Sequence, residues 1–267
     1  MMHSDLHVHT TYCDGKSTVE EIIRKAEELG MVSIGFSGHG YTDFDTSYCM
    51  SIEDTKNYIE DIKRAKEKAN LEVYLGIEKD ILSDLDTSCF DYSIGSCHYI
   101  KKDGMYLEVD SSRSFEKNVN NIYGGDYLAF CKDYYRTICE YLPKAKADIA
   151  GHIDLVTKFN EGGKFFSEED KPYQSYALEA MDVVKEVCPL IELNTGAIAR
   201  GYRKSPYPAK FILDYIRQKD IKIVINSDSH NKDTLCFYHD ESIEILKHIG
   251  FKSHVILKNS HFEEVGL

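Results

Sequence analysis

Ser4-Asp5-Leu6-His7-Val8-His9-Thr10 is a short segment in which polar and apolar residues alternate. In an extended strand successive side chains point to opposite faces, so His7 and His9 share one face while Leu6 and Val8 share the other. Two adjacent imidazoles on one face form an arrangement that can chelate a metal ion. A polar edge strand with two exposed histidines would show the same pattern, so this segment alone leaves both interpretations open.

Strand-like and helix-like segments alternate along the rest of the chain. The expected strands are residues 3–9, 32–37, 72–77, 92–96, 148–151, 190–193 and 221–226, with a further short candidate at 254–257. The expected helices are residues 19–29, 51–69, 126–141, 167–187, 208–219 and 240–249, and residues 100–125 are expected to be irregular. Ser17 or Thr18 can cap the first helix, and Gly30 can end it. This order is typical of parallel strands joined by right-handed crossovers.

Seven of the expected strands end on a polar or metal-binding residue. In an open doubly wound sheet the site residues come from a few strands at one switch point, whereas a closed barrel collects them from every strand at one rim. No repeat, low-complexity tract or linker divides the 267 residues. We therefore expect one domain over residues 1–267, an α/β distorted (β/α)7 barrel of TIM-like form, with a metal site at the C-terminal ends of the strands.

The composition argues against several classes of protein. A net charge of −13 disfavours a nucleic-acid-binding surface, although it does not exclude a small phosphorylated substrate. No apolar run approaches the roughly 18 residues that a membrane helix needs, and the N-terminal segment lacks a signal-peptide core. We therefore expect a cytoplasmic protein that binds neither nucleic acid nor membrane. The eight cysteines are scattered, without a C-x-x-C pair, and are expected to be reduced thiols.

Potential metal ligands stand at or just beyond the strand ends. They are His7, His9, His39, Glu78, His98, His152, Asp228 and His230. Glycines beside three of these histidines, at positions 38, 95 and 151, leave room for an ion or a substrate. Imidazoles and carboxylates without a required thiolate suit zinc, iron or manganese. Eight ligands exceed the coordination number of one ion, so we expect two to three divalent transition-metal ions, with Glu78 bridging a pair.

The remaining histidines and one cysteine are expected to lie outside this centre. His3, His239, His248, His254 and His261 are predicted to be surface residues. Cys97 precedes His98, so on a strand its side chain would point the other way and pack in the core.

The ordered motifs of the chain resemble those of the polymerase and histidinol phosphatase (PHP) superfamily. The motifs are His7-Val8-His9-Thr10-Thr11-Tyr12-Cys13-Asp14-Gly15, Phe36-Ser37-Gly38-His39, Gly76-Ile77-Glu78 and Asn226-Ser227-Asp228-Ser229-His230. The resemblance extends from residue 3 to about residue 230. Three inner stretches are most similar to the histidinol-phosphate phosphatases of that superfamily: Tyr74–Glu78, Phe90–His98 and Ile191–Thr195.

The resemblance implies a distorted (β/α)7 barrel with a trinuclear metal centre. It matches His7, His9, Glu78 and Asp228 to one metal, Glu78, His98 and His152 to a second, and His39 and His230 to a third. Some family members have a histidine shortly after the His-x-His pair, where this chain has Cys13-Asp14-Gly15. Asp14 is the nearest chelating residue there, so the third metal site is the one that this departure affects.

A phosphate monoester also needs cationic side chains beside the ions. Arg200 is the preferred match to the phosphate-contacting residue of the family, with Arg203 and Lys158 as further candidates. Arg203 has an equal claim to be a solvated loop charge. The amine of histidinol would be helped by an acidic or aromatic wall, for which the rim loops offer residues that the sequence cannot rank: Asp43, Asp45, Tyr99, Glu108, Asp110, Glu161 and Tyr202.

The resulting hypothesis is a metal-dependent phosphomonoesterase that hydrolyses L-histidinol phosphate to L-histidinol and phosphate in histidine biosynthesis, by a metal-activated hydroxide. Glu78 would bridge two ions, and Asp228 or His230 would handle the proton of the water or the leaving group. One alternative is a phosphatase of the same superfamily that acts on a nucleotide or on phosphotyrosine. A second is a non-catalytic metal-binding protein. The oligomeric state is left open.

Overall fold

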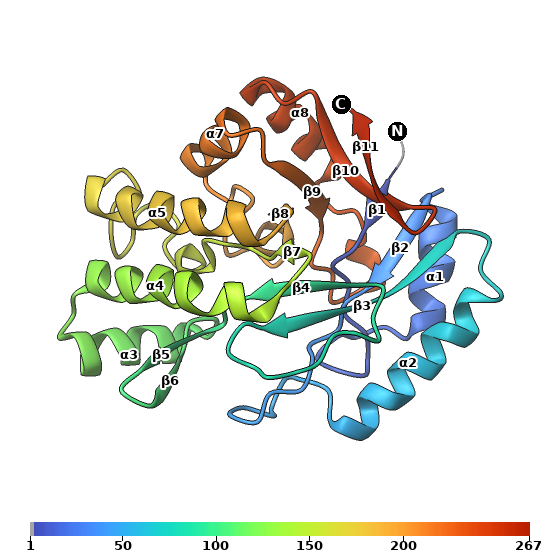
Figure 1. Cartoon of the computed structure of the whole chain (residues 1–267), viewed down its shortest axis with the longest axis horizontal. Coiled ribbons are helices and arrows are strands. Elements are labelled where there is room, and N and C mark those ends of the chain that lie inside the picture. Colours follow the sequence, from blue (N-terminus) through green and yellow to red (C-terminus); the bar gives the residue numbers. More distant parts are fainter. Residues whose placement is uncertain (1–2) are drawn as a thin grey trace.

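One nine-stranded sheet runs through the molecule, in the order β1-β2-β3-β4-β7-β8-β9-β10-β11 (Figure 1). The computed structural model describes residues 3–267. The strands are β1 (Ser4–Asp5), β2 (Ser33–Phe36), β3 (Glu72–Asp80), β4 (Tyr92–Ser96), β7 (Ile149–Ala150), β8 (Leu190–Asn194), β9 (Lys222–Asn226), β10 (Ser253–Lys258) and β11 (His261–Gly266). Neighbours from β1 to β10 are parallel, and β11 is antiparallel to β10.

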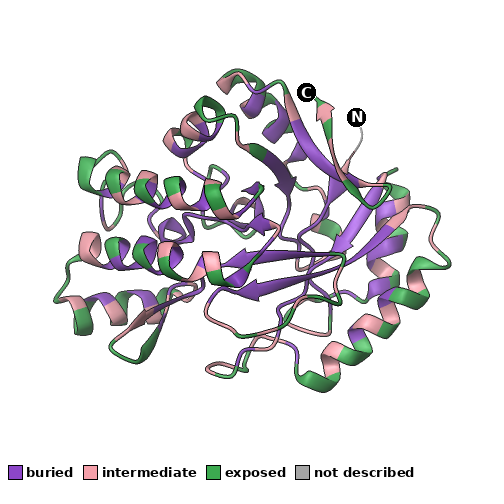
Figure 2. Ribbon diagram, in the orientation of Figure 1, coloured by how far each residue is buried: buried purple, intermediate pink, exposed green. Residues whose placement is uncertain are grey.

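Helices connect the parallel strands and cover the outer side of the sheet (Figure 1). They are α1 (Val19–Glu28), α2 (Ile52–Lys66), α3 (Ser112–Tyr123), α4 (Tyr127–Ala145), α5 (Lys171–Val187), α6 (Gly196–Ala199), α7 (Lys210–Gln218) and α8 (His239–Ile249), with short 3-10 turns η1 (Leu155–Thr157) and η2 (Lys232–Thr234). A separate hairpin consists of β5 (Tyr99–Lys102) and β6 (Met105–Glu108). Figure 2 shows buried strands inside helices whose outer faces are exposed, the pattern of amphipathic crossover helices.

The sheet is curled, so that its first strand meets a later one. The backbone N–H of His9 donates to the carbonyl of Ser229 at 2.8 Å, and the N–H of Ser229 donates to the carbonyl of His7 at 3.0 Å. On the other side, the N–H of Ser37 donates to the carbonyl of Val8 at 2.9 Å. The segment after β1 therefore lies between the ends of β2 and β9. The fold is mixed α/β, with the strongly curled sheet of TIM-like proteins.

The structure confirms the order of most expected elements. Thr18 is the N-cap of α1, within a capping box completed by Glu21, and Gly30 follows the helix with φ of +67°. The ladder of the first strand covers only Ser4–Asp5, which is shorter than expected.

The expectation of an irregular segment is wrong, because residues 100–125 contain most of the β5–β6 hairpin and helix α3. Strand β11, which was not predicted, extends the sheet beyond the last expected strand. Asp103-Gly104 is the signal that identifies the hairpin, because both residues have positive φ, as a tight two-residue hairpin turn requires. Helix α3 is mostly polar, and only two of its residues, Phe115 and Val119, are buried. The sequence therefore shows too weak an apolar pattern to predict this helix.

A buried tyrosine occupies space between strands that glycines leave open. Tyr92 is 1% exposed, and its hydroxyl donates to the carbonyl of Leu6. A Cβ atom added at Gly76 would lie 2.2 Å from Cζ of this ring, and one added at Gly35 would lie 2.3 Å from its hydroxyl oxygen. The two glycines therefore admit an aromatic ring at the base of the curled sheet.

Replacing Gly76 by alanine should lower the free energy of unfolding by about 1–3 kcal/mol, because the new methyl group cannot enter without displacing Tyr92. Urea unfolding of the wild type and the variant in the same metal-containing buffer measures the difference. Gly266→Ala is the matched control, since no atom lies within 4 Å of a Cβ at that strand position. Equal stability of the two variants would contradict the packing argument.

Candidate metal centre

The curled sheet brings the predicted ligands together at one end of the strands. His7 and His9 follow β1, His39 follows β2, and Glu78 lies within β3. The remaining predicted ligands follow later strands, namely His98 after β4, His152 after β7, and Asp228 and His230 after β9. Apart from His230, these predicted ligands are at most 8% exposed.

Glu78 lies at the middle of the cluster. Its Oε2 atom is 2.9 Å from Nδ1 of His39, 3.2 Å from Nε2 of His7 and 3.5 Å from Nε2 of His9. Its Oε1 atom is 3.1 Å from Nε2 of His152 and 3.3 Å from Nε2 of His98. Five imidazoles therefore face one buried carboxylate, an arrangement in which the carboxylate can bridge two cations.

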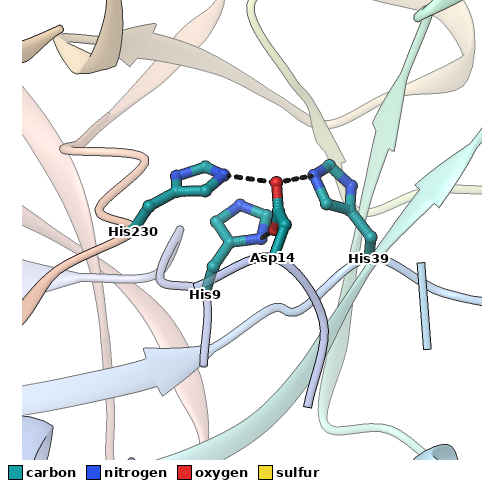
Figure 3. A group of neighbouring side chains, drawn as sticks. All are labelled: His9, Asp14, His39 and His230. Carbon is teal, nitrogen blue, oxygen red and sulfur yellow. Dashed lines mark hydrogen bonds and ion pairs between the residues drawn. The ribbon is translucent and has the colours of Figure 1, made fainter. Parts of the chain in front are cut away.

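A second group gathers around Asp14 (Figure 3). Oδ2 of Asp14 is 3.1 Å from Nε2 of His230 and 3.7 Å from Nε2 of His39, and Oδ1 is 3.5 Å from Nδ1 of His9. The rings of His9 and His230 stack with their centroids 3.9 Å apart. Asp14 thus occupies a position from which it can share a cation with these three histidines.

The donor atoms at the centre fit metal ions. Nε2 of His7, Nε2 of His9 and Oε2 of Glu78 are buried atoms without a hydrogen-bond partner in the described residues. Leaving such atoms unsatisfied is costly, and a cation among them would remove that cost. At this centre, ligand atoms of the described residues that lie within 4.8 Å of one another form four sets: His7-His9-Glu78, His7-His152-Asp228, His39-Glu78-His98 and His9-Asp14-His39-His230.

The charges of the cluster depend on one another. Burial alone would raise the pKa of the Glu78 carboxyl, but the imidazoles of His7, His39 and His98 hold that pKa well below its usual range. Burial opposes protonation of His7, yet the carboxylates of Glu192, Glu78 and Asp228 raise its pKa well above the ordinary value. The carboxylates of the centre thus favour positive charge on the ring of His7, which a bound cation would also supply.

One buried carboxylate of the site was not foreseen from the sequence. Glu192, in β8, has Oε1 2.6 Å from Nδ1 of His7, and its carboxylate accepts from the backbone N–H of His152 at 2.9 Å. The side-chain amides of Asn194 and Asn226 donate to it at 2.9 and 2.8 Å. Because Glu192 accepts at Nδ1 of His7, the Nε2 atom of that ring is directed to Glu78, as supporting carboxylates do at metal sites. The sequence gives one hint of this role, because Glu192 is an acidic residue that directly follows and precedes apolar residues of its strand.

Asp80 supports a second imidazole in the same way. Its Oδ2 atom lies 3.3 Å from Nδ1 of His98 and accepts from the backbone N–H of that residue at 3.1 Å. It lies two residues beyond Glu78 on β3, so its side chain points to the same face of the strand.

The three basic candidates have different surroundings. Nη2 of Arg200 donates to Oδ2 of Asp228 at 2.8 Å, and its Nη1 atom donates to the carbonyl of that residue at 3.0 Å, which places the guanidinium beside the cluster. Lys158 is paired with Asp110. Arg203 is buried and donates to Glu168 at 2.7 Å, so the structure does not bring it to the centre.

A pocket of about 110 Å³ opens on the cluster. It is lined by Asp14, His39, Ser47, Tyr48, His98, Tyr99, Glu108 and Asp110. Three residues of the unranked rim set, Tyr99, Glu108 and Asp110, thus meet at one place.

Two of the histidines expected at the surface are buried instead. His239 is 3% exposed and His254 is 8% exposed, whereas His248 and His261 are exposed as expected. His239 is the first residue of α8 and is buried where this helix packs against the sheet. The pattern of polar residues in the sequence does not reveal this packing. Cys97 lies in the core, 3% exposed, as expected.

Replacing Glu78 by glutamine should lower the metal content by at least one ion per chain. The neutral amide cannot offset the charge of cations held by the five surrounding imidazoles, and it is a weaker ligand than a carboxylate. Elemental analysis after identical metal loading and desalting measures the content. Glu60→Gln, at an exposed position of α2, is the matched control, and a Glu78 variant that keeps the full metal content would contradict the central role of this carboxylate.

Metal retention should fall as the pH is lowered from about 7.5 to about 5.5, because the ring of His7 has a pKa well above the ordinary value and must lose a proton to bind a cation. The carboxylates Glu192 and Glu78 raise the pKa of His7, so its ring takes up a proton in the metal-free form, and acid favours that form. His9 does not contribute, because burial and the nearby His230 lower its pKa to about 3. Metal content after equilibrium dialysis at each pH gives the curve, and a flat curve would contradict proton competition.

Known proteins resemble this chain in sequence and in fold. Residues 5–196 match the model of the PHP domain. A probable histidinol-phosphatase of Deinococcus radiodurans is 26% identical over 92% of this chain and 93% of its own length. A histidinol-phosphatase of Bacillus subtilis is 26% identical over 91% of this chain and 99% of its own length.

Two solved structures share the fold. One, from Listeria monocytogenes and assigned as a histidinol phosphatase, has a TM-score of 0.72 at 22% identity and covers 89% of this chain and 99% of its own. The other is histidinol phosphate phosphatase from Lactococcus lactis, complexed with zinc, L-histidinol and phosphate, with a TM-score of 0.68 at 15% identity over 97% of this chain and 98% of its own. On the extent of the domain match, the chain belongs to the PHP domain family.

Proposed function

We propose that this chain is a metal-dependent phosphomonoesterase that hydrolyses L-histidinol phosphate to L-histidinol and phosphate. The observation that carries the proposal is a buried carboxylate, Glu78, faced by five imidazoles beside the guanidinium of Arg200. Metal ligands next to a bidentate cation suit a phosphate monoester. The two curated relatives are named as histidinol-phosphatases, and the Lactococcus lactis structure holds zinc with both products of that reaction.

The proposal includes one domain over residues 1–267 that forms a distorted (β/α)7 barrel, with two to three zinc, iron or manganese ions at the C-terminal ends of its strands. The first ion would be held by His7, His9, Glu78 and Asp228, the second by Glu78, His98 and His152, and the third by Asp14, His39 and His230. Bound there, such ions lower the pKa of water and neutralise charge on a phosphoryl group.

The residues around these ligands would bind and orient the substrate. Arg200 carries two donor nitrogens that face the cluster, and they can hold two oxygens of a phosphoryl group as they now hold Asp228. Lys158 supplies a second cation behind the pocket-lining carboxylate of Asp110, with which it is paired. Glu192 fixes the ring of His7, and Asp228 and His230 are the groups proposed to take up a proton from water and return one to the leaving oxygen. Arg203 is left out of the phosphate site, since it is paired with Glu168.

A panel of phosphate esters tests the function. The wild-type protein, loaded with zinc or manganese, should hydrolyse L-histidinol phosphate with a kcat/KM at least about 100-fold above those for nucleoside monophosphates and phosphotyrosine, because a site that binds the polar groups of its substrate rejects esters that lack them. Equal kcat/KM values across the panel would contradict L-histidinol phosphate as the substrate and would favour a phosphatase that acts on another phosphate ester.

Within the same panel, Arg200→Ala should lower kcat/KM for L-histidinol phosphate by about 100-fold to 1,000-fold, the usual cost of removing a donor to a developing oxyanion. Arg24→Ala, on the exposed face of α1, is the matched control. If the Arg200 variant had unchanged kinetics, the phosphate contact would have to be assigned to another cationic side chain, and Lys158 is the next candidate.

A further inference from the structure

Both cations near the metal centre are paired with carboxylates. Arg200 is held by Asp228, and Lys158 is held by Asp110. The Lys158–Asp110 pair is asymmetric, because the lysine side chain is 8% exposed whereas the aspartate side chain is 37% exposed. A ligand that enters the pocket therefore meets Asp110 first, and it reaches the ammonium of Lys158 only by separating the pair.

The wall around Asp110 is acidic. Asp110 and Glu108 line the pocket together with two tyrosines, Tyr48 and Tyr99, and with imidazoles of the centre. The carboxylate of Glu108 has no hydrogen-bond or ion-pair partner in residues 3–267. The carboxylate of Asp45, by contrast, accepts a hydrogen bond from the hydroxyl of Tyr99, with 2.6 Å between the two oxygens. This wall suits a small cationic group, and the pocket volume of about 110 Å³ corresponds to a few non-hydrogen atoms.

We propose that Asp110 binds the ammonium group of the substrate, and that Lys158 leaves Asp110 for the phosphoryl group in the same binding event. The inference rests on the proposed function, whose substrate carries a phosphate and an amine. One ion pair of the free protein would be replaced by two pairs with the ligand, Lys158 with phosphate and Asp110 with ammonium. No buried charge is left without a partner when both groups of the ligand are present.

The exchange makes the amine a determinant of specificity. A phosphate ester without an amine would still draw Lys158 away, and it would leave Asp110 without a partner beside Glu108 and Asp14. Unpaired charges in a confined site are strongly penalised, so such an ester should be rejected. The metal ligands and Arg200 cannot make this distinction, because they act on the phosphoryl group that all such esters share.

The exchange also couples two ligands. Inorganic phosphate that binds Lys158 frees Asp110 for an amine, and an amine on Asp110 frees Lys158 for phosphate. By linkage, each product should raise the affinity of the other by the same factor. A pocket in which Asp110 only stabilises the fold around Lys158 would show no such coupling.

The first test compares L-histidinol phosphate with its deamino analogue, imidazolylpropyl phosphate, in the wild type and in Asp110→Asn. The wild type should prefer the amine-bearing ester by about 100-fold in kcat/KM, and the variant should lose most of this preference, to a ratio below about 5. Asp103→Asn, at the turn of the β5–β6 hairpin that precedes Asp110, is the matched control and should keep the wild-type ratio. An Asp110 variant that keeps the full preference would overturn the proposal.

The second test measures binding of products to the metal-loaded protein by calorimetry. In the wild type, saturating phosphate should tighten the binding of L-histidinol at least about fivefold, a typical coupling between two sites. In Asp110→Asn this coupling should be absent, and phosphate alone should bind more tightly because Lys158 is no longer held. In Lys158→Met the coupling should also be absent, and L-histidinol alone should bind more tightly. Coupling that persists in both variants would overturn the proposal.

The two tests separate this inference from the proposed function. If the wild type does not prefer L-histidinol phosphate over the ester panel, the proposed function fails. If the wild type prefers it but Asp110→Asn keeps either the amine preference or the product coupling, only the exchange fails. If Asp110→Asn does not fold, the calorimetric test relies on Lys158→Met. This variant is expected to bind L-histidinol more tightly, whereas a loss of structure would weaken the binding.

Discussion

The structure depends on how one buried carboxylate is satisfied. Glu192 accepts from Nδ1 of His7, from the backbone of His152 and from the amides of Asn194 and Asn226, groups that belong to four different strands or their extensions. An isolated carboxylate in this interior would be expensive, so these partners must be in place together. Asn226 in turn accepts from the backbone N–H of Leu6 at 2.9 Å. One charge thus ties the closure of the sheet to the orientation of a metal-binding ring.

The same dependence explains what the sequence could and could not predict. The shared face of His7 and His9 follows from strand geometry, and the sequence motifs single out Glu78, so the residues that gather at the centre could be named from the sequence. The pairing of Lys158 with Asp110 and the burial of His239 were not, because each depends on a contact between segments far apart in the chain. Local sequence patterns reveal whether a segment has the periodicity of a helix or of a strand. They do not reveal which charged side chains from distant segments will form an ion pair.

The centre also balances charge within an acidic protein. The chain has a net charge of −13, yet Glu78 and Asp228 are surrounded by imidazoles and by Arg200, and these neighbours hold the pKa of both carboxyls well below the usual range. Cations bound to neutral imidazoles would provide the same compensation. Excess negative charge lies elsewhere, for example on helix α1, where four glutamates face only one arginine and one lysine, and the site stays able to accept an anionic ligand.

The backbone bonds that join Ser229 to His7 and His9 have a consequence for biosynthesis. More than two hundred positions separate the residues on either side of this seam, so the His-x-His segment is synthesised long before its partner. A nascent polypeptide that lacks β9 has neither Asp228 nor the partner that fixes the His-x-His segment. The complete ligand set can therefore assemble only after β9 has left the ribosome, and this closure is a contact of high sequence separation.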